Sequence, residues 1–145
     1  MPFLVFLLLV AAAGACGAAF PPGAWYAALA KPAWTPPNVV FGPVWATLYV
    51  MIAVAGWLVW RTGDRKALAI WGSGLSLNAV WSWLFFGRHA IGWALVDIVL
   101  IWLSIAAFII WTWSRERRAS LLFLPYLAWV SLAIALNAAI WRLNG

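Results

Sequence analysis

Charged side chains are scarce in this sequence. Lys, Arg, Asp and Glu make up 8% of its 145 residues, and only three residues are acidic. A soluble domain carries about 25% charged residues, whereas hydrophobic residues make up 68% of this chain. The composition therefore excludes a soluble globular domain and indicates an integral membrane protein. Since a spanning helix needs roughly 20 residues, the chain has room for about five spans in a single membrane domain.

Side chains that usually carry catalysis are equally few. The sequence has one histidine, His89, and one cysteine, Cys16, besides its three acids. These numbers allow no metal cluster, no Ser-His-Asp set and no pair of carboxylates. A GSG segment at 72–74 is better suited to close helix packing than to nucleotide binding, with Gly72 and Ser76 at small-xxx-small spacing. The sequence favours a binding protein, and enzymatic activity stays uncertain.

The charge-free runs predict where the chain crosses the membrane, because a Lys or Arg at the bilayer centre costs about 3 kcal/mol. The runs predict an all-α bundle of five transmembrane helices. Their expected ranges are 2–20, 38–61, 66–86, 90–114 and 118–142, with an ordered loop at 21–37.

Basic residues lie between these runs and predict the topology. The loops after the second and fourth runs carry six of them: Arg61, Arg65, Lys66, Arg115, Arg117 and Arg118. The remaining three are Lys31, Arg88 and Arg142. The positive-inside rule then places the N-terminus inside and the C-terminus outside. Because the net charge of +6 lies in short loops and not on one polar face, nucleic acid is not an expected partner.

The 21–37 segment is long for a loop in so small a protein, and such loops are usually either functional or disordered. Its aromatic residues Trp25, Tyr26 and Trp34 and its several prolines argue against disorder. Prolines fix the backbone and reduce the entropy that ordering or ligand binding would remove. We therefore predict an ordered lid over one end of the bundle.

Tryptophan is unusually abundant, with 14 residues in the chain. Rings at the membrane interface form aromatic belts, but rings in the middle of helices either pack together or line a cavity for a flat apolar ligand. Three polar residues also fall inside the runs: Asn78, Asp97 and Asn137. For the asparagines, interhelical hydrogen bonding and ligand contact stay open as alternatives. For Asp97, which shares a helical face with Trp93 at i−4, a structural pair within the bundle is expected.

Four blocks of sequence resemble a known family. They read KPAWTPP and FGPVWATLY within 31–49, LNAVWSWLFFG at 77–87, GWALVD at 92–97, and LPYLAW followed by LN and WR within 124–142. In this order and spacing they resemble the translocator protein family, also called tryptophan-rich sensory proteins (TspO) or peripheral benzodiazepine receptors. The resemblance implies a five-helix bundle, usually a homodimer, with a pocket that opens toward the loop after the first helix.

The resemblance also implies a function. Members bind porphyrins, benzodiazepine-site ligands and, in some animals, cholesterol. We therefore expect a membrane receptor or transport-related protein that takes a porphyrin, such as protoporphyrin IX or haem, as ligand and needs no obligatory cofactor. The other expected partners are membrane lipid and a second copy of the chain. The residues expected to contact the ligand are Tyr26, Trp34, Trp45, Asn78, Trp81, Trp93, Ala133, Asn137 and Ala138.

One position departs from the family pattern. Ala138 stands where a sterol motif of some animal members has a tyrosine, which makes sterol recognition doubtful and favours a bacterial member in a bacterial membrane. Some bacterial members place a tryptophan there, paired across the pocket with the one matching Trp45. That pair is linked to porphyrin breakdown, so the alternative function is Trp-dependent, photo-oxidative porphyrin degradation. Ala138 removes half of the pair.

Overall fold

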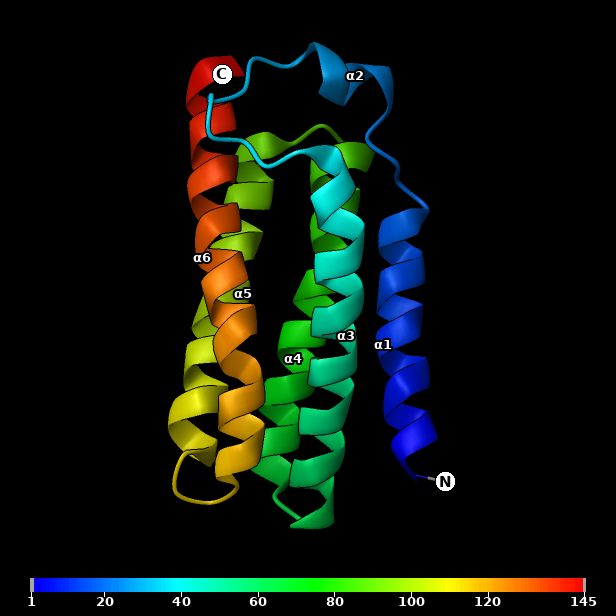
Figure 1. Cartoon of the computed structure of the whole chain (residues 1–145), viewed down its shortest axis with the longest axis vertical. Coiled ribbons are helices and arrows are strands. Elements are labelled where there is room, and N and C mark those ends of the chain that lie inside the picture. The colour runs from blue at the N-terminus through cyan, green and yellow to red at the C-terminus, as the bar shows by residue number, and fades with distance from the viewer. Residues whose placement is uncertain (1, 145) are drawn as a thin grey trace.

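The computed structural model of the chain describes residues 2–144, and over these residues it contains helices and no strands. The elements are α1 (Pro2–Ala18), α2 (Gly23–Ala28), α3 (Asn38–Arg61), α4 (Arg65–Ser82), a π-helical turn η1 (Trp83–Gly87), α5 (Ile91–Thr112) and α6 (Arg117–Asn144). The five long helices run side by side, and the short α2 lies across the end where α6 finishes (Figure 1). This end is called the lid end below.

Local signals explain the helix boundaries. Pro37 has extended backbone angles and precedes the first residue of α3, while Gly63 follows the same helix with a φ of 74°, a conformation that glycine adopts without strain. Asp64 then caps α4 by accepting a hydrogen bond from the Ala67 N–H at 3.0 Å. Two helices contain an internal proline, Pro43 in α3 and Pro125 in α6, and both continue through it.

Helices α1, α3, α5 and α6 begin and end within about two residues of the ranges expected from the charge-free runs. Helix α4 begins one residue early but ends at Ser82, four residues before the expected end, and η1 continues from there to Gly87. Helices α3, α5 and α6 are long and apolar enough to cross a membrane, and α1 is a shorter apolar helix of 17 residues. Helix α4 does not meet the same criterion of length and composition. The loop at 21–37 differs from expectation in one respect, because six of its residues form the helix α2.

Two glycines permit close helix packing. A Cβ on Gly56 of α3 would lie 2.6 Å from the Trp71 ring of α4, whose indole N–H donates to the Ile52 carbonyl at 2.8 Å. A Cβ on Gly74 of α4 would lie 2.5 Å from the Ser104 hydroxyl of α5. Gly72, which the sequence suggested for packing, would meet nothing within 4 Å. Its position two residues from Gly74 turns it to a different side of the helix.

The interior divides into two clusters. The larger one joins the long helices and includes Ile52, Trp71, Ile105 and Phe108. The smaller one lies at the lid end and includes Tyr26, Phe85, Ile91, Ala94, Leu136 and Ile140. In the larger cluster Phe108 is fully buried, and some of its other members, such as Ile98 and Ile101, also border the cavity described below.

Contacts at both ends fix the lid. The Asn144 side chain at the end of α6 donates to the Ala30 carbonyl at 2.8 Å and accepts from the Ala30 N–H at 3.0 Å. On the other side, the Trp25 ring of α2 stacks on His89, with ring centroids 3.9 Å apart and planes 5° from parallel. His89 adopts a φ of 54° in the short connection between η1 and α5. The lid is therefore tied to the chain on two sides.

Candidate ligand-binding site

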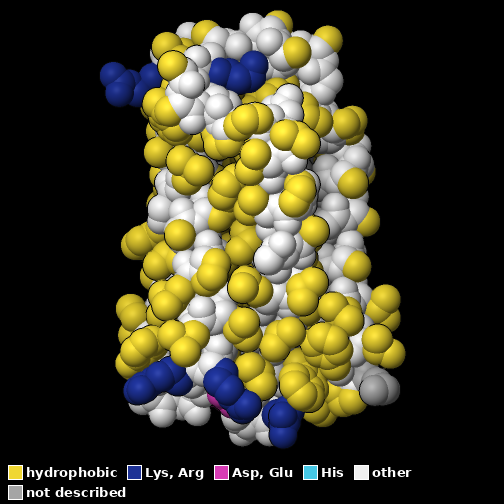
Figure 2. Space-filling view, viewed as in Figure 1, with side chains coloured by type: hydrophobic (Ala, Val, Ile, Leu, Met, Phe, Trp, Pro, Cys, Tyr) yellow, Lys and Arg dark blue, Asp and Glu magenta, His cyan; other side chains and the backbone are white. Residues whose placement is uncertain are grey.

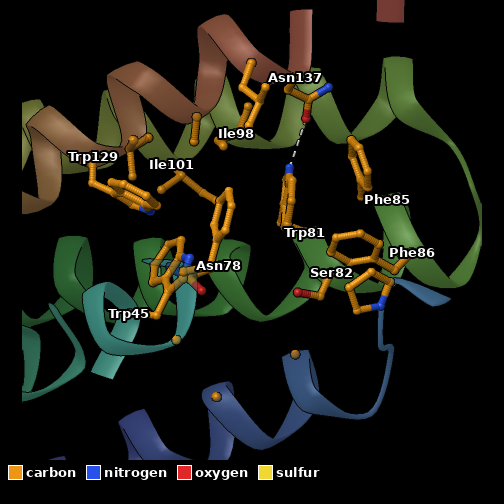
Figure 3. Close-up of a pocket in the computed structure, with 18 of the residues that line it drawn as sticks. Trp45, Asn78, Trp81, Ser82, Phe85, Phe86, Ile98, Ile101, Trp129 and Asn137 are labelled. Atoms are coloured by element: carbon orange, nitrogen blue, oxygen red, sulfur yellow. Dashed lines mark hydrogen bonds between the residues drawn. The ribbon is translucent and has the colours of Figure 1, made fainter. Parts of the chain in front are cut away.

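A cavity of about 590 Å³ lies in the lid half of the bundle. All five long helices and η1 contribute to its wall, and Pro22 and Tyr26 of the lid region border it. This volume falls in the range of pockets that hold drug-sized ligands. Figure 3 shows several aromatic rings in its lining, together with aliphatic side chains and few polar groups.

One part of the wall is built from Trp45 of α3 and Trp129 of α6, which lie together in Figure 3. Their rings are 6.5 Å apart and nearly perpendicular, at 89°. Phe41 supports Trp129 at 5.5 Å, and Tyr49 lies 5.5 Å from Trp45. Edge-to-face contacts of this kind hold aromatic rings in fixed positions. Trp45 and Trp129 therefore present preformed apolar surface to the cavity.

A second group of rings lies nearer the lid. Trp81 of α4 stacks on Phe85 of η1 at 5.0 Å, and Phe86 packs edge-on against both Trp81, at 5.6 Å, and Tyr26, at 5.5 Å. The π-helical turn brings both phenylalanines to the cavity, and such turns are frequent at functional sites. Burial raises the pKa of the Tyr26 hydroxyl above its ordinary value.

The polar residues of the wall are tied to other helices. Asn137 of α6 accepts a hydrogen bond from the Trp81 indole at 3.1 Å and donates to the Ile91 carbonyl of α5 at 3.1 Å (Figure 3). Asn78 of α4 donates to the Tyr126 hydroxyl of α6 at 2.9 Å. Both asparagines therefore form hydrogen bonds to other helices. Asn137 is 2% exposed and uses both the oxygen and the nitrogen of its side-chain amide.

Some polar groups on residues that border the cavity have no hydrogen-bond partner in the described part of the chain. Among the described residues, the indole N–H groups of Trp45 and Trp129 donate to no oxygen, in contrast to that of Trp81. The Asn78 carbonyl oxygen likewise accepts from no described group. A ligand with a few polar atoms on an apolar body would match this surface.

Six of the nine residues expected to contact a ligand line the cavity: Tyr26, Trp45, Asn78, Trp81, Ala133 and Asn137. Three do not. Trp34 is 50% exposed, Trp93 is 70% exposed, and Ala138 lies one residue beyond the cavity-facing Asn137. On α5 the buried stripe runs through Ala94 and later residues at helical spacing, and Trp93 stands about 100° away from it.

Asp97 also differs from expectation. It is 5% exposed, so it does not share the outward face of Trp93, and its Oδ2 has no hydrogen-bond partner among the described residues. The expected structural pair is therefore not formed at this oxygen. Elsewhere in residues 2–144, no three His, Cys, Asp or Glu side chains come together in a group that could hold a metal ion.

Several lining residues were not anticipated from the sequence. They are Gly14, Gly17, Phe41, Tyr49, Phe85, Phe86, Ile98, Ile101 and Trp129. Trp129 carried a signal, since it is a mid-helix tryptophan. From the first helix, the small residues Gly14, Gly17 and Ala18 border the cavity. The phenylalanines depend on the π-helical turn, which no pattern in the sequence indicated.

Together these features define an all-helical integral membrane protein with a largely apolar, ligand-sized cavity beneath a lid.

Residues 5–142 match the model of the TspO/MBR family. The chain is 40% identical to protein CrtK of Rhodobacter capsulatus over 147 residues, covering 98% of this chain and 92% of CrtK. It is 40% identical to the human translocator protein over 126 residues, covering 83% and 75% of the two chains. The tryptophan-rich protein TspO of Archaeoglobus fulgidus is 42% identical over 123 residues, covering 83% of this chain and 80% of its own. The chain belongs to the TspO/MBR family.

Proposed function

We propose that this protein is a membrane receptor that binds porphyrins and flat apolar ligands of the benzodiazepine-site type in the cavity beneath α2. The observation that carries the proposal is the pair of Trp45 and Trp129, whose rings both line the cavity and lie 6.5 Å apart. An apolar macrocycle can pack on such rings while polar substituents accept from the indoles. Family membership, with relatives named translocator and sensory proteins, supports the same function.

The proposal includes five membrane crossings. Helices α3, α5 and α6 have the required length and apolarity. Helix α4 and η1 follow one another without a break, with 18 and 5 residues, which together reach roughly 34 Å. The 17 residues of α1 reach roughly 25 Å, and its exposed leucines face outward beside the longer helices. A homodimer is proposed by analogy with the family.

The experiment is a titration with protoporphyrin IX that follows quenching of tryptophan fluorescence in the detergent-solubilised protein. Trp45→Ala should weaken the Kd roughly tenfold or more, since one ring contact and one indole donor are lost. Trp93→Ala is the matched control, because Trp93 is 70% exposed and lies away from the cavity. Linear quenching that responds equally to both substitutions would mean that the pigment only dissolves in the micelle, and would refute the proposal.

A second function, light-driven oxidative breakdown of a bound porphyrin, is favoured by one observation. Position 138 is an alanine, so the chain lacks the second tryptophan of the family pair. The Trp129 ring nevertheless lies 6.5 Å from the Trp45 ring. Illumination of the aerobic complex should then yield a new absorbing product that Trp45→Phe abolishes. An unchanged spectrum in the wild type, despite saturable binding, would leave the receptor function alone.

A further inference from the structure

The end of the bundle opposite the lid carries a concentration of positive charge. Six basic side chains lie there, on the ends of α3 to α6 and the two loops that join them: Arg61, Arg65, Lys66, Arg115, Arg117 and Arg118. Figure 2 shows basic side chains gathered at this end, below an apolar flank. This group of residues is called the basic end here.

The two acids of the basic end offset only part of this charge. Asp64 accepts from the Ala67 N–H at 3.0 Å with one oxygen and from the Trp111 indole at 2.9 Å with the other. Burial acts to raise the pKa of Asp64, but these hydrogen bonds and the charge of Arg115 outweigh it, so the pKa is lowered. Both oxygens of Glu116 accept from Arg118, at 2.9 and 3.1 Å. Among the described residues, the other five cations of the basic end have no carboxylate partner.

Trp111 organises the centre of this surface. Its indole donates to Asp64, which fixes the ring between the two loops. The Lys66 ammonium lies 4.4 Å and the Arg115 guanidinium 3.8 Å from the centre of the ring. Each cation is attracted to the ring's π-electrons, which offsets part of the repulsion between the two charges. One cation from the start of α4 and one from the loop before α6 are thereby held at one site.

The flanking cations are arranged in the same way. The Arg61 guanidinium lies 4.8 Å from the Trp57 ring, and that of Arg117 lies 4.8 Å from the Trp113 ring. Tryptophan rings prefer the level of the lipid headgroups. The rings therefore hold the cations at the depth where lipid phosphates lie.

We propose that the basic end is a binding surface for the phosphate groups of anionic phospholipids, with Lys66 and Arg115 at its centre. The unneutralised cations supply charge complementarity, and guanidinium groups suit phosphate oxygens because they offer several N–H donors in one plane. The anion is a lipid and not a soluble phosphate because the cations stand directly above exposed apolar helix surface. A molecule that joins a phosphate to acyl chains satisfies both surfaces at once.

The test measures lipid selectivity with spin-labelled phosphatidylglycerol and phosphatidylcholine around the protein in mixed-lipid membranes. The wild type should prefer phosphatidylglycerol by a factor on the order of five. The double variant Lys66→Gln, Arg115→Gln should lose most of this preference. The matched control Arg88→Gln, Arg142→Gln removes two charges from the lid end, including one cation that lies 5.8 Å from a tryptophan ring, and should retain it.

Two further measurements distinguish lipid binding from misfolding and from a site for free phosphate. Arg65→Gln should also lower the preference, and since Arg65 makes no hydrogen bond, ion pair or ring contact with a described residue, misfolding would not account for the loss. Inorganic phosphate should displace the labelled lipid no better than sodium chloride at equal ionic strength. Equal loss in both double variants, a wild type without preference, or specific displacement by phosphate would each overturn the proposal. None of these outcomes depends on porphyrin binding in the cavity.

Discussion

Asn137→Leu tests whether Asn137 positions the wall of the cavity or contacts the ligand. The substitution preserves approximate size but removes the acceptor of the Trp81 indole and the donor to the Ile91 carbonyl. Because Ile91 is the first residue of α5, its carbonyl can still accept the helical hydrogen bond from four residues on. The main loss is therefore the partner of the Trp81 N–H.

The magnitude follows from burial. Asn137 is 2% exposed, so the orphaned indole N–H would lose its partner in a largely apolar interior. An unsatisfied buried donor costs about 1–3 kcal/mol, while interhelical hydrogen bonds measured in membranes average about 0.6 kcal/mol. We expect Asn137→Leu to lower the free energy of unfolding by about 1–2 kcal/mol. The Trp81 ring should also lose its fixed orientation in the cavity.

The assay is a double-mutant cycle with Trp81→Phe, measured by reversible unfolding in mixed micelles and by protoporphyrin IX titration. When both partners become apolar, no donor is left unpaired, so the double variant should be more stable than the sum of the single losses predicts, by about 1 kcal/mol. In the Trp81→Phe background, Asn137→Leu should no longer weaken ligand binding. Strictly additive stabilities, or a binding loss that persists without the Trp81 indole, would show that Asn137 acts on the ligand directly.

Three other predictions concern packing, pH and the lid. Gly56→Ala should destabilise the protein by about 1–3 kcal/mol in the same unfolding assay, because its Cβ would lie 2.6 Å from the Trp71 ring, whereas Gly72→Ala should be tolerated; equal effects would contradict this account of helix contact. The pKa of Asp64 is lowered, so the carboxylate stabilises the fold at pH values above its ordinary pKa of about 4, and this contribution is lost as the pH falls through the folded-state pKa. Asp64→Asn should therefore flatten the acid side of the pH–stability curve. An unaltered curve would refute this prediction. Asn144→Ala should release the loop from α6 and speed proteolysis between α2 and α3, and an unchanged cleavage rate would show that the Trp25 stack suffices.

The positions of the long helices follow from the sequence because a charge is expensive in hydrocarbon, and this constraint acts on each segment separately. The second charge-free run ends at Arg61, which is also the last residue of α3. The third run follows the basic pair Arg65 and Lys66, and α4 begins at Arg65. The short α2 could not be inferred in this way. Its six residues carry no periodic pattern, and their helix is supported by tertiary contacts such as the stack of Trp25 on His89.

The cavity wall was harder to predict because it depends on rotation about each helix axis. Trp93 and Ala94 are neighbours in sequence, yet Trp93 is 70% exposed and Ala94 is fully buried. Nearly every residue of α5 is apolar, so its hydrophobic pattern does not distinguish the lipid face from the interior. The polar residues did mark the interior, since Asn78 and Asn137 must find partners there.

The location of the cavity results from an uneven distribution of side-chain size along the bundle. Near the basic end, Gly56 admits the Trp71 ring and the space between α3 and α4 is filled. Near the lid, Gly42 leaves open space beside α3, since a Cβ there would meet no atom within 4 Å, although the residue borders the cavity. Near the basic end, therefore, a glycine allows a large ring to pack between two helices. Near the lid, a glycine leaves space that Trp45 and Trp129 do not fill. Rigid rings held by edge-to-face contacts cannot collapse into that room, so the space persists as a preformed cavity.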